Sequence, residues 1–407
     1  MIMDRTTRQK LCLKRWLQAG GAASVVACTG FGKTRLALNL ISAFVKRNEE
    51  CSCLVVVPTE VLKNQWIDEL ENWGLLNNAR VEIINTVVKK EWTCDFLTID
   101  EAHLVASDMF SKVFECVSYK NILCLTATLE RLDGKEELIK KYAPVCDTIT
   151  INEAEQNGWV APHKEYCVLL DVDLTEYNNY SKEFNQCFAY FNWDFGIAML
   201  CATNAKSAKI YAKKLGLDWK QVIGVAQKWN RAMRARKAFI QNHPKKIEIA
   251  KKILAARPNS KAMTFSATIK QAESFGFGYV VHSKQKKNDN SKIIEDFNNS
   301  ESGVLHSSKA CNTGLDLKGI DLEIILNTDS SKIKKVQTLG RALRFEEGKT
   351  SEIFTLVLRN TQEVAWFNNS NTSKVITINE EQLNRVLSGE EIQTREHENI
   401  TNTKFRF

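Results

Sequence analysis

The sequence predicts two tandem α/β domains with parallel sheets and a helical insertion between them. Three observations predict this fold class. Short apolar runs alternate with amphipathic segments over residues 1–150, and the same alternation returns after residue 255. Between these regions, residues 175–256 show a helical pattern with few strand signals. Alternating strands and helices favour parallel sheets. A chain of 407 residues is too long for a single hydrophobic core of ordinary size, which favours more than one domain.

The first domain is predicted to span residues 1–165. Its apolar runs are short and rich in Val, Ile or Leu, and they lie at residues 24–27, 54–57, 96–99 and 122–125. Such runs suit strands that are buried on both faces of a parallel sheet. The segment after the first run repeats apolar residues at helical spacing: Leu36, Ala37, Leu40, Ile41, Phe44 and Val45. This order predicts a doubly wound sheet.

The remaining domain boundaries follow from the same patterns. We expect a helical insertion or linker at residues 175–250, a second α/β domain at 251–371 and a polar C-terminal tail at 372–407. The second domain has apolar runs at residues 262–265, 279–281, 304–305, 323–326 and 353–358. In the tail, only the short amphipathic stretch 382–387 is expected to pack, and the last residues are expected to fray.

Composition narrows the class of protein. There is no uninterrupted apolar run of about 18 residues and no secretory signal, so we expect no membrane span and a cytoplasmic location. The 12 cysteines are then expected to be reduced thiols. The net charge of +8 is compatible with a polyanion such as nucleic acid, although many proteins without such a partner share it.

The residues ACTGFGKT, at positions 27–34, form a candidate phosphate-binding loop. They follow an apolar run and open an amphipathic segment. Small residues, namely Thr29, Gly30 and Gly32, let backbone N–H groups turn toward phosphates, and the helix N-terminus adds a positive dipole end. Lys33 is placed to reach the β- and γ-phosphates of ATP, and Thr34 to bind Mg²⁺. Alanine replaces the usual first glycine.

The residues DEAH, at positions 100–103, follow the apolar run at 96–99 directly. Their carboxylates then lie at the carboxyl end of a buried strand, where open α/β sheets bind ligands. Asp100 is suited to hold Mg²⁺, and Glu101 to orient and deprotonate an attacking water. The alternative interpretation is that the two carboxylates cap the next helix.

The phosphate loop, DEAH and then TAT follow one another as in the superfamily 2 helicases, and the chain resembles the DEAH type of that family. The resemblance implies two RecA-like P-loop domains that hydrolyse ATP between them, with Mg²⁺. It assigns adenine contact to Gln9. It assigns coupling between the nucleotide and the other domain to His103, Thr126 and Thr128.

The resemblance extends to segments that contact nucleic acid in the family. VPTEVLKNQW is similar to one that contacts the strand backbone, here through Pro58 and Thr59. MTFSAT resembles another, with Ser266 in the contact position. SSKACNTGLD resembles the motif that touches both strand and nucleotide, and its core residues are Thr313, Gly314 and Asp316.

QTLGRALR, which contains Gln337, Arg341 and Arg344, resembles the arginine-finger helix of the family. Positions three apart share one helical face. A guanidinium forks onto phosphate oxygens and stabilises charge that develops during transfer, so these residues join Glu101 as candidate catalytic groups. The alternative is an exposed basic helix face.

Within the family, the segment TATLERLDGK looks most like compact DNA helicases of the phage branch-migration and DNA-repair type. We therefore expect a monomer in the host cytoplasm that unwinds or remodels single-stranded or branched DNA, moving 3′ to 5′. Three alternatives stay open: an RNA helicase or remodeller, a duplex DNA translocase subunit without strand separation, and a nucleotide-gated clamp. Comparing activity on DNA and RNA separates the first of these.

The helical insertion carries two further clusters with open interpretations. Its aromatic residues stack bases of a single strand, or form a helical core that packs on the first domain. They are Tyr177, Tyr180, Phe184, Phe188, Tyr190, Phe191, Trp193 and Phe195. Its basic residues track a phosphate backbone, or form a solvated face. They are Arg231, Arg234, Arg236 and Lys237.

The phosphate loop yields a first prediction. Lys33→Ala abolishes ATP turnover, because the phosphates lose their charge partner. Steady-state phosphate release measures this, and retained turnover would contradict the assignment of the loop.

Overall fold

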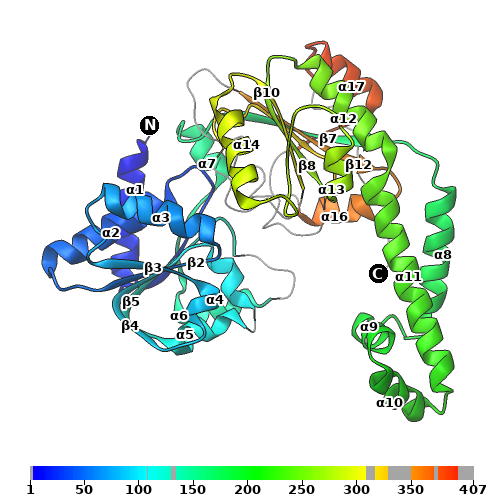
Figure 1. Ribbon diagram of the computed structural model, residues 1–407, viewed down its shortest axis with the longest axis horizontal. Coiled ribbons are helices and arrows are strands. Elements are labelled where there is room, and N and C mark those ends of the chain that lie inside the picture. Colours follow the sequence, from blue (N-terminus) through cyan, green and yellow to red (C-terminus); the bar gives the residue numbers. More distant parts are fainter. Residues whose placement is uncertain are drawn as a thin grey trace.

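The computed structural model describes residues 3–107, 109–129, 134–308, 317–328, 350–370 and 375–392. These residues form two domains, each built on a parallel sheet, and a group of helices that projects from the second domain (Figure 1). The predicted fold class is confirmed.

The first domain contains a sheet of six parallel strands in the order β3-β2-β4-β5-β1-β6. The predicted runs correspond to β1 (Ala22–Ala27), β2 (Cys53–Val57), β4 (Trp92–Ile99) and β5 (Val117–Thr126). The two edge strands, β3 (Ala79–Ile83) and β6 (Val145–Ile149), were not predicted. Both include exposed positions, so neither gives a continuous apolar run.

Helices cover both faces of this sheet. Val55 belongs to one apolar cluster, whereas Leu54 and Val56 belong to another, because successive side chains of a strand point to opposite faces. The first cluster includes residues of α1 (Arg5–Gln18), α2 (Lys33–Arg47) and α3 (Glu60–Asn72). The second includes residues of α4 (Ile84–Val87), η1 (Ala102–Ala106), α5 (Val113–Cys116) and α6 (Glu136–Tyr142). A further turn, η2 (Phe110–Lys112), and α7 (Ile151–Gln156) complete the domain.

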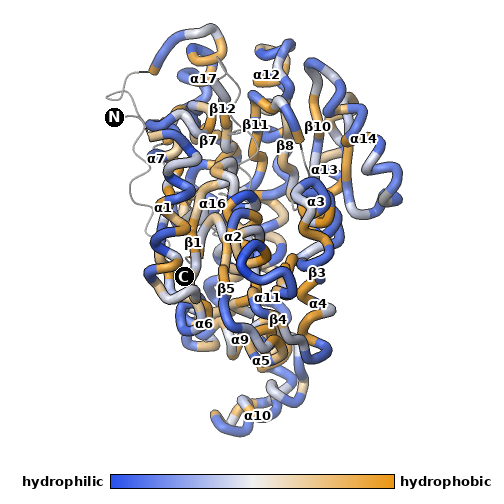
Figure 2. Tube along the Cα trace, turned by 90° about the vertical axis from the view of Figure 1, so that its left-hand side faces the viewer, coloured by the Kyte–Doolittle hydropathy of each residue, from blue (hydrophilic) through white to orange (hydrophobic). Residues whose placement is uncertain are grey.

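Polar and apolar residues alternate along the surface helices, as the mixed blue and orange of Figure 2 shows. None of the described helices is both long and apolar enough to cross a membrane. The cysteines within the described ranges are free thiols, and most of them are buried.

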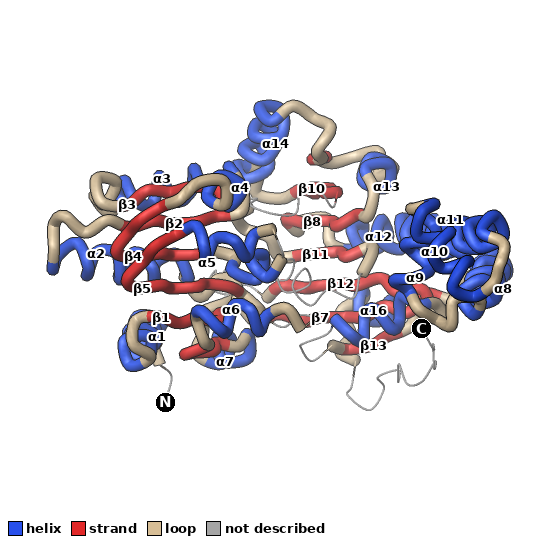
Figure 3. The backbone as a smooth tube through the Cα atoms, turned by 90° about the horizontal axis from the view of Figure 1, so that it is seen from below, coloured by secondary structure: helices blue, strands red, loops and turns tan. Residues whose placement is uncertain are grey.

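The second domain contains a sheet of seven parallel strands in the order β13-β7-β12-β11-β8-β10-β9 (Figure 3). All five predicted runs are confirmed as β8 (Lys261–Ser266), β9 (Tyr279–Val281), β10 (Gly303–Ser308), β11 (Leu322–Ile325) and β12 (Ser351–Leu358). Helices α12 (Pro244–Ala256), α13 (Ile269–Glu273), α14 (Lys287–Asn299) and α16 (Gln362–Ser370) accompany them.

The boundary between the domains differs from the prediction. Strand β7 (His163–Leu170) pairs with β12 from His163 opposite Ser351 to Leu170 opposite Leu358, so it belongs to the second sheet. A first domain that ended at residue 165 would cut this strand. The apolar run of β7 follows the first domain closely in sequence, and nothing in the run itself identifies the sheet that it joins.

The predicted polar tail also contains packed structure. Strand β13 (Ile376–Ile378) pairs with β7, and α17 (Glu380–Leu387) buries Leu383 and Val386 against the second domain. A capping box between Asn379 and Gln382 starts this helix. The tail therefore extends the second domain as far as α17.

The predicted insertion is helical. We call the group α8 (Thr175–Ala189), α9 (Phe195–Thr203), α10 (Ala205–Leu215) and α11 (Trp219–Asn242) the arm (Figure 1). Helix α12, part of which fell within the predicted insertion, instead packs on the second sheet through Ile249, Ala250 and Ile253.

Aromatic residues form the core of the arm. The ring of Trp229 in α11 lies 5.5 Å from Phe188 and 5.3 Å from Phe195, measured between centroids. The helical-core interpretation is confirmed for residues such as Phe188 and Phe191, whereas Trp193 and Phe195 are exposed. Among the described residues, this core packs on α11 and not on the first domain. Arg236 is buried, with its guanidinium 4.5 Å from the Phe184 ring, so it belongs to neither a solvated face nor a phosphate track.

A buried ion pair fixes α12 to the second sheet. The Lys246 ammonium lies 2.6 Å from the Glu363 carboxylate, and both side chains are fully buried. The Glu363 carboxylate also accepts a hydrogen bond from the backbone N–H of Leu358 at 3.0 Å. Because water does not reach either side chain, each charge is stabilised mainly by the opposite charge of its partner.

This pair yields a stability prediction. Lys246→Met destabilises the protein by about 3–5 kcal/mol, because it leaves an unpaired buried carboxylate. The double variant Lys246→Met/Glu363→Gln costs less, since the amide is neutral and still accepts the Leu358 N–H. Urea unfolding followed by circular dichroism measures both, and equal losses would contradict the explanation.

Candidate nucleotide-binding site

The candidate phosphate loop joins β1 to α2 through two glycines in the left-handed region. Gly30 has φ 83° and Gly32 has φ 93°, a conformation that other residues adopt only with strain. Gly32 caps α2, and Lys33 is the first residue of that helix. A Cβ atom at Gly32 would lie 2.7 Å from Nε2 of Gln9, so a side chain there would displace the Gln9 amide from the loop, in addition to straining the backbone.

Gln9 reaches the loop from α1. Its Nε2 donates a hydrogen bond to the Phe31 carbonyl at 3.0 Å, and the side chain is buried. The structure thus brings together Gln9 and the loop, which are far apart in sequence.

Two polar groups of the loop fit a bound phosphate. The Thr29 hydroxyl is buried and has no hydrogen-bond partner among the described residues. The Lys33 ammonium lies 3.2 Å from the Ala27 carbonyl, folded over the loop. An unsatisfied hydroxyl, a cation and the N-terminus of a 15-residue helix converge there, which is a donor set suited to phosphate oxygens.

Asp100 follows β4 and is largely buried. The indole N–H of Trp66 donates to one carboxylate oxygen at 2.9 Å, and the backbone N–H of Glu101 donates to the other at 2.9 Å. Burial, and then repulsion from Glu101, raise the pKa of Asp100 to about 6, whereas the Trp66 bond and Lys33 lower it. Such a carboxylate fits Mg²⁺, because a divalent cation relieves both the burial cost and the repulsion.

Glu101 has a strained backbone. Its φ of 51° places a non-glycine residue in the left-handed region. Its carboxylate lies 3.4 Å from Nδ1 of His103. Strain of this kind concentrates at functional sites, which agrees with the catalytic role predicted for Glu101.

A chain of hydrogen bonds leads from Glu101 to the strand beside it. Nδ1 of His103 lies 3.1 Å from the Thr126 hydroxyl, which in turn donates to the Thr128 carbonyl at 2.8 Å. Because the Thr126 hydroxyl has one proton and gives it to that carbonyl, Nδ1 of His103 is the donor. The three residues predicted to couple the site are therefore connected to each other and to Glu101.

Two supporting features were not predicted. The first is the bond from Trp66 to Asp100, because the sequence places Trp66 only at the end of a segment predicted to contact nucleic acid. The second is a buried network in which Arg8 binds Asp147 at 2.5 Å and Glu153 at 2.6 Å. Arg8 interrupts the buried face of α1, and a charge on an apolar face was the signal for such a network.

The predicted strand-contacting residues lie where strands end. Pro58 and Thr59 follow β2, and Thr59 caps α3 by accepting from the Leu62 N–H at 3.3 Å. Ser266 ends β8, and its buried hydroxyl has no partner within the described part of the chain. The other predicted site residues lie outside the described residues: Thr313, Gly314, Asp316, Gln337, Arg341 and Arg344.

Family models match the two ends of the chain. Residues 3–92 match the type III restriction enzyme, res subunit, and residues 245–346 match the helicase conserved C-terminal domain. The first match contains the phosphate loop. The first match also contains Pro58 and Thr59, whereas the second contains the other segments assigned to strand contact and the segment assigned to the arginine finger.

Two relatives are similar to the chain over most of its length, although at low sequence identity. The chain is 24% identical over 384 residues to the DNA 3'-5' translocase XPB2 of Sulfurisphaera tokodaii, covering 87% of this chain and 82% of the relative. It is 23% identical to the DNA 3'-5' helicase XPB of Mycobacterium tuberculosis, covering 86% of this chain and 60% of the relative.

A solved structure of S. cerevisiae Dbp5 bound to RNA and ADP BeF3 superposes with a TM-score of 0.58 at 13% identity, covering 93% of this chain and 91% of that one. At this identity the likeness concerns the fold alone. Together, the family matches and the relatives support an ATP-dependent nucleic-acid helicase of superfamily 2. The DEAH subtype and the phage type stay predictions.

The bond to Asp100 yields a further prediction. Trp66→Phe removes one N–H donor from the carboxylate and lowers the apparent affinity for Mg²⁺ by about tenfold, as is typical for a group that orients a metal ligand. ATP turnover measured against Mg²⁺ concentration tests this.

The matched control is Trp16→Phe. The Trp16 indole, also buried, donates to the Ile122 carbonyl at 3.0 Å, away from the loop. Both variants lose one indole hydrogen bond, so a similar change in Mg²⁺ dependence in the two would contradict the role of Trp66.

Proposed function

We propose that the chain is an ATP-driven DNA helicase or translocase that moves 3′ to 5′ along one strand. One observation carries the proposal: the phosphate loop, the acidic pair and the Thr126–Thr128 segment follow β1, β4 and β5, which are consecutive neighbours in the sheet. Nucleotide binding, water activation and coupling therefore meet at one sheet edge. DNA and the direction are supported by the names of the two relatives.

In this proposal, different residues of the chain bind the phosphates, hold Mg²⁺ and activate water for ATP hydrolysis. Lys33 and the N–H groups of the loop bind the phosphates, and Thr34 and Asp100 would hold Mg²⁺. The ion would neutralise charge on the phosphate oxygens. Glu101 orients the attacking water and takes its proton. By the resemblance to the arginine-finger helix, Arg341 and Arg344, with Gln337, would stabilise the phosphate charge from the second domain, so that turnover would require the two domains to meet.

Coupling to the nucleic acid follows the hydrogen bonds from Glu101. His103 contacts both the Glu101 carboxylate and the Thr126 hydroxyl. A change in charge at Glu101 therefore alters the position of His103 and the turn at Thr126 and Thr128. That turn leaves the sheet at the end of β5, beside the strand that carries Asp100.

The strand is held at sheet ends in both domains. Thr59 follows β2 and Ser266 ends β8, and Thr313 belongs to the same proposed set. Hydroxyl and backbone contacts bind phosphate and sugar, and so they grip a strand without reading its sequence. The net charge of +8 favours such contacts.

A duplex translocase without strand separation is the second candidate function. Two comparisons favour it. The relative from Sulfurisphaera tokodaii is named a DNA translocase, and the family model that matches residues 3–92 is described as the res subunit of a type III restriction enzyme. The site chemistry is the same in both candidates, so the substrate distinguishes them.

One experiment tests the function and its alternatives. ATP turnover and strand displacement are measured side by side on single-stranded DNA, duplex DNA, forked DNA, a four-way junction and RNA of matched length. We expect DNA to stimulate turnover more than RNA, and forked DNA to be unwound. Stimulation by duplex DNA without displacement would favour the translocase, and stronger stimulation by RNA would contradict the DNA assignment.

The role of Glu101 yields a prediction of its own. Glu101→Gln binds ATP and DNA but lowers the turnover number by about 10² to 10⁴, because an amide does not accept the proton of water. Nucleotide and DNA binding measured by fluorescence anisotropy separate binding from turnover.

Glu115→Gln is the control for this change. Glu115 is exposed in α5 of the same domain, and its substitution leaves turnover unaltered. Normal turnover in Glu101→Gln would remove Glu101 from the role of base.

A further inference from the structure

The arm joins the second domain through a short root. Helix α11 ends at Asn242 and α12 starts at Pro244, so His243 alone separates them, with an extended backbone (φ −60°, ψ 125°). Helix α12 is packed on the sheet, whereas α11 leads away from it (Figure 1). One extended residue does not fix the angle between two helices, so contacts beside it must do so.

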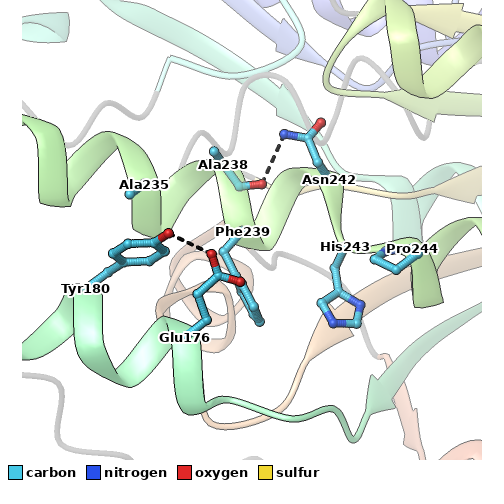
Figure 4. A pocket seen from close by; sticks show the side chains of 8 residues that line it. All are labelled: Glu176, Tyr180, Ala235, Ala238, Phe239, Asn242, His243 and Pro244. Carbon is cyan, nitrogen blue, oxygen red and sulfur yellow. Dashed lines mark hydrogen bonds between the residues drawn. The ribbon is translucent and has the colours of Figure 1, made fainter.

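Packing at this root is incomplete. A hollow of about 350 Å³ lies between the first turns of α8 and the end of α11 (Figure 4). Glu176 and Tyr180 face it from α8, and Phe239 and His243 face it from the α11 side. The hydrogen bonds beside this hollow therefore act together with the packing of Tyr177 on Phe239 to orient the arm.

Gln271 makes the most central of these bonds. It lies in α13, which follows β8, and it is buried. Its Nε2 donates to the Gln241 carbonyl, at the end of the arm, at 2.8 Å. Its Oε1 accepts from the Ala267 N–H at 2.9 Å and from the Asn327 amide at 2.6 Å. One side chain therefore holds the arm, the turn after β8 and the loop after β11.

Further hydrogen bonds lie on either side of those made by Gln271. The Thr268 hydroxyl lies 3.4 Å from the Asn242 amide oxygen, to which it donates. Asn327 in turn accepts from the buried Lys246 ammonium at 3.2 Å. The turn that contains Ala267 and Thr268 directly follows Ser266, the residue proposed to contact the strand.

A second, separate anchor holds α8. The Tyr177 hydroxyl, which is buried, accepts from the backbone N–H of Gln362 at 2.9 Å and from the Arg236 guanidinium at 3.3 Å. Gln362 starts α16, directly after β12. Both helices at the root are thus bound to the carboxyl edge of the second sheet.

We propose that Gln271 is a positioning residue that binds the arm to the strand-contacting turn after β8, so that the two move as one body. The exposed Arg231, Arg234 and Lys237 of α11 then keep a fixed place relative to Ser266. This inference rests on the proposed function, because it assigns nucleic-acid contact to that turn. It adds that the arm angle determines how tightly the strand is held.

The decisive variant is Gln271→Glu. A carboxylate keeps an acceptor for the Ala267 N–H and the Asn327 amide, but it replaces the donor to the Gln241 carbonyl by a second oxygen, which repels it. The turn is retained and the arm is released. Tyr177→Phe releases the arm at the other anchor with Gln271 intact, so the test does not depend on one variant folding.

Gln285→Glu is the matched control. Gln285 also bridges two backbone groups in the second domain, accepting from the His282 N–H at 3.1 Å and donating to the Val280 carbonyl at 3.2 Å. It contacts β9 and its following turn, and not the arm. The chemical change is identical, although Gln285 is half-buried and Gln271 is buried.

Two measurements separate the outcomes. Without nucleic acid, amide hydrogen exchange at the end of α11 is expected to be faster in Gln271→Glu and Tyr177→Phe than in the wild type and in Gln285→Glu. With a single-stranded DNA oligomer, the KM for DNA in the ATPase assay rises by about tenfold in both arm variants, consistent with one lost buried hydrogen bond, while kcat at saturating DNA stays within about twofold.

Unaltered exchange in both arm variants would overturn the anchoring, and so would equal acceleration in Gln285→Glu. Faster exchange with an unaltered KM would overturn the link between the arm and strand binding. A wild-type ATPase that no nucleic acid stimulates would instead overturn the proposed function, while the exchange experiment still decides whether Gln271 anchors the arm.

Discussion

The parallel direction of all strands in each sheet is the constraint on which the other features depend. Because parallel strands end at one edge, every loop that follows a strand starts there, however distant the loops are in sequence. The loop after β1, the acidic pair after β4 and the Thr126–Thr128 turn after β5 are thereby brought together. In the second sheet, the same rule places the turn after β8, the loop after β11 and the start of α16 side by side.

Buried polar contacts then set the position of each group at these edges. Asp100 receives two hydrogen bonds, and yet burial and the neighbouring Glu101 keep its pKa at about 6. Gln9 is held to the loop by the same helix that Arg8 fixes to Asp147 and Glu153. The acidic pair brings two carboxylates close together at a buried position, whereas the buried Arg8 is paired with Asp147 and Glu153. Neighbouring like charges that raise a pKa in this way are concentrated at functional sites.

The sequence predicted most of the strands, including the edge strand β9, but it missed β3, β6 and β13 and also β7, which lies inside the second sheet. Runs such as residues 54–57 are apolar throughout, because both faces of a central strand are covered. The edge strands β3 and β6 have exposed positions and gave no such signal. The motifs located Lys33, Asp100, Glu101 and Gln9, since spacing within a loop is local. Long-range contacts were not predictable from periodicity: Trp66 to Asp100, the packing of the aromatic residues on α11, and the sheet that β7 joins.

The pairing of β7 alters how the arm relates to the two domains. The chain enters the second sheet at His163, leaves it for the arm after β7, and returns through α12. The covalent connection between the first domain and the second is the segment 157–162. The arm is inserted between β7 and α12, which both belong to the second domain. The motor therefore keeps its covalent continuity whatever the arm's length. A change in the length of the arm leaves the covalent connection between the two domains, at residues 157–162, unaltered.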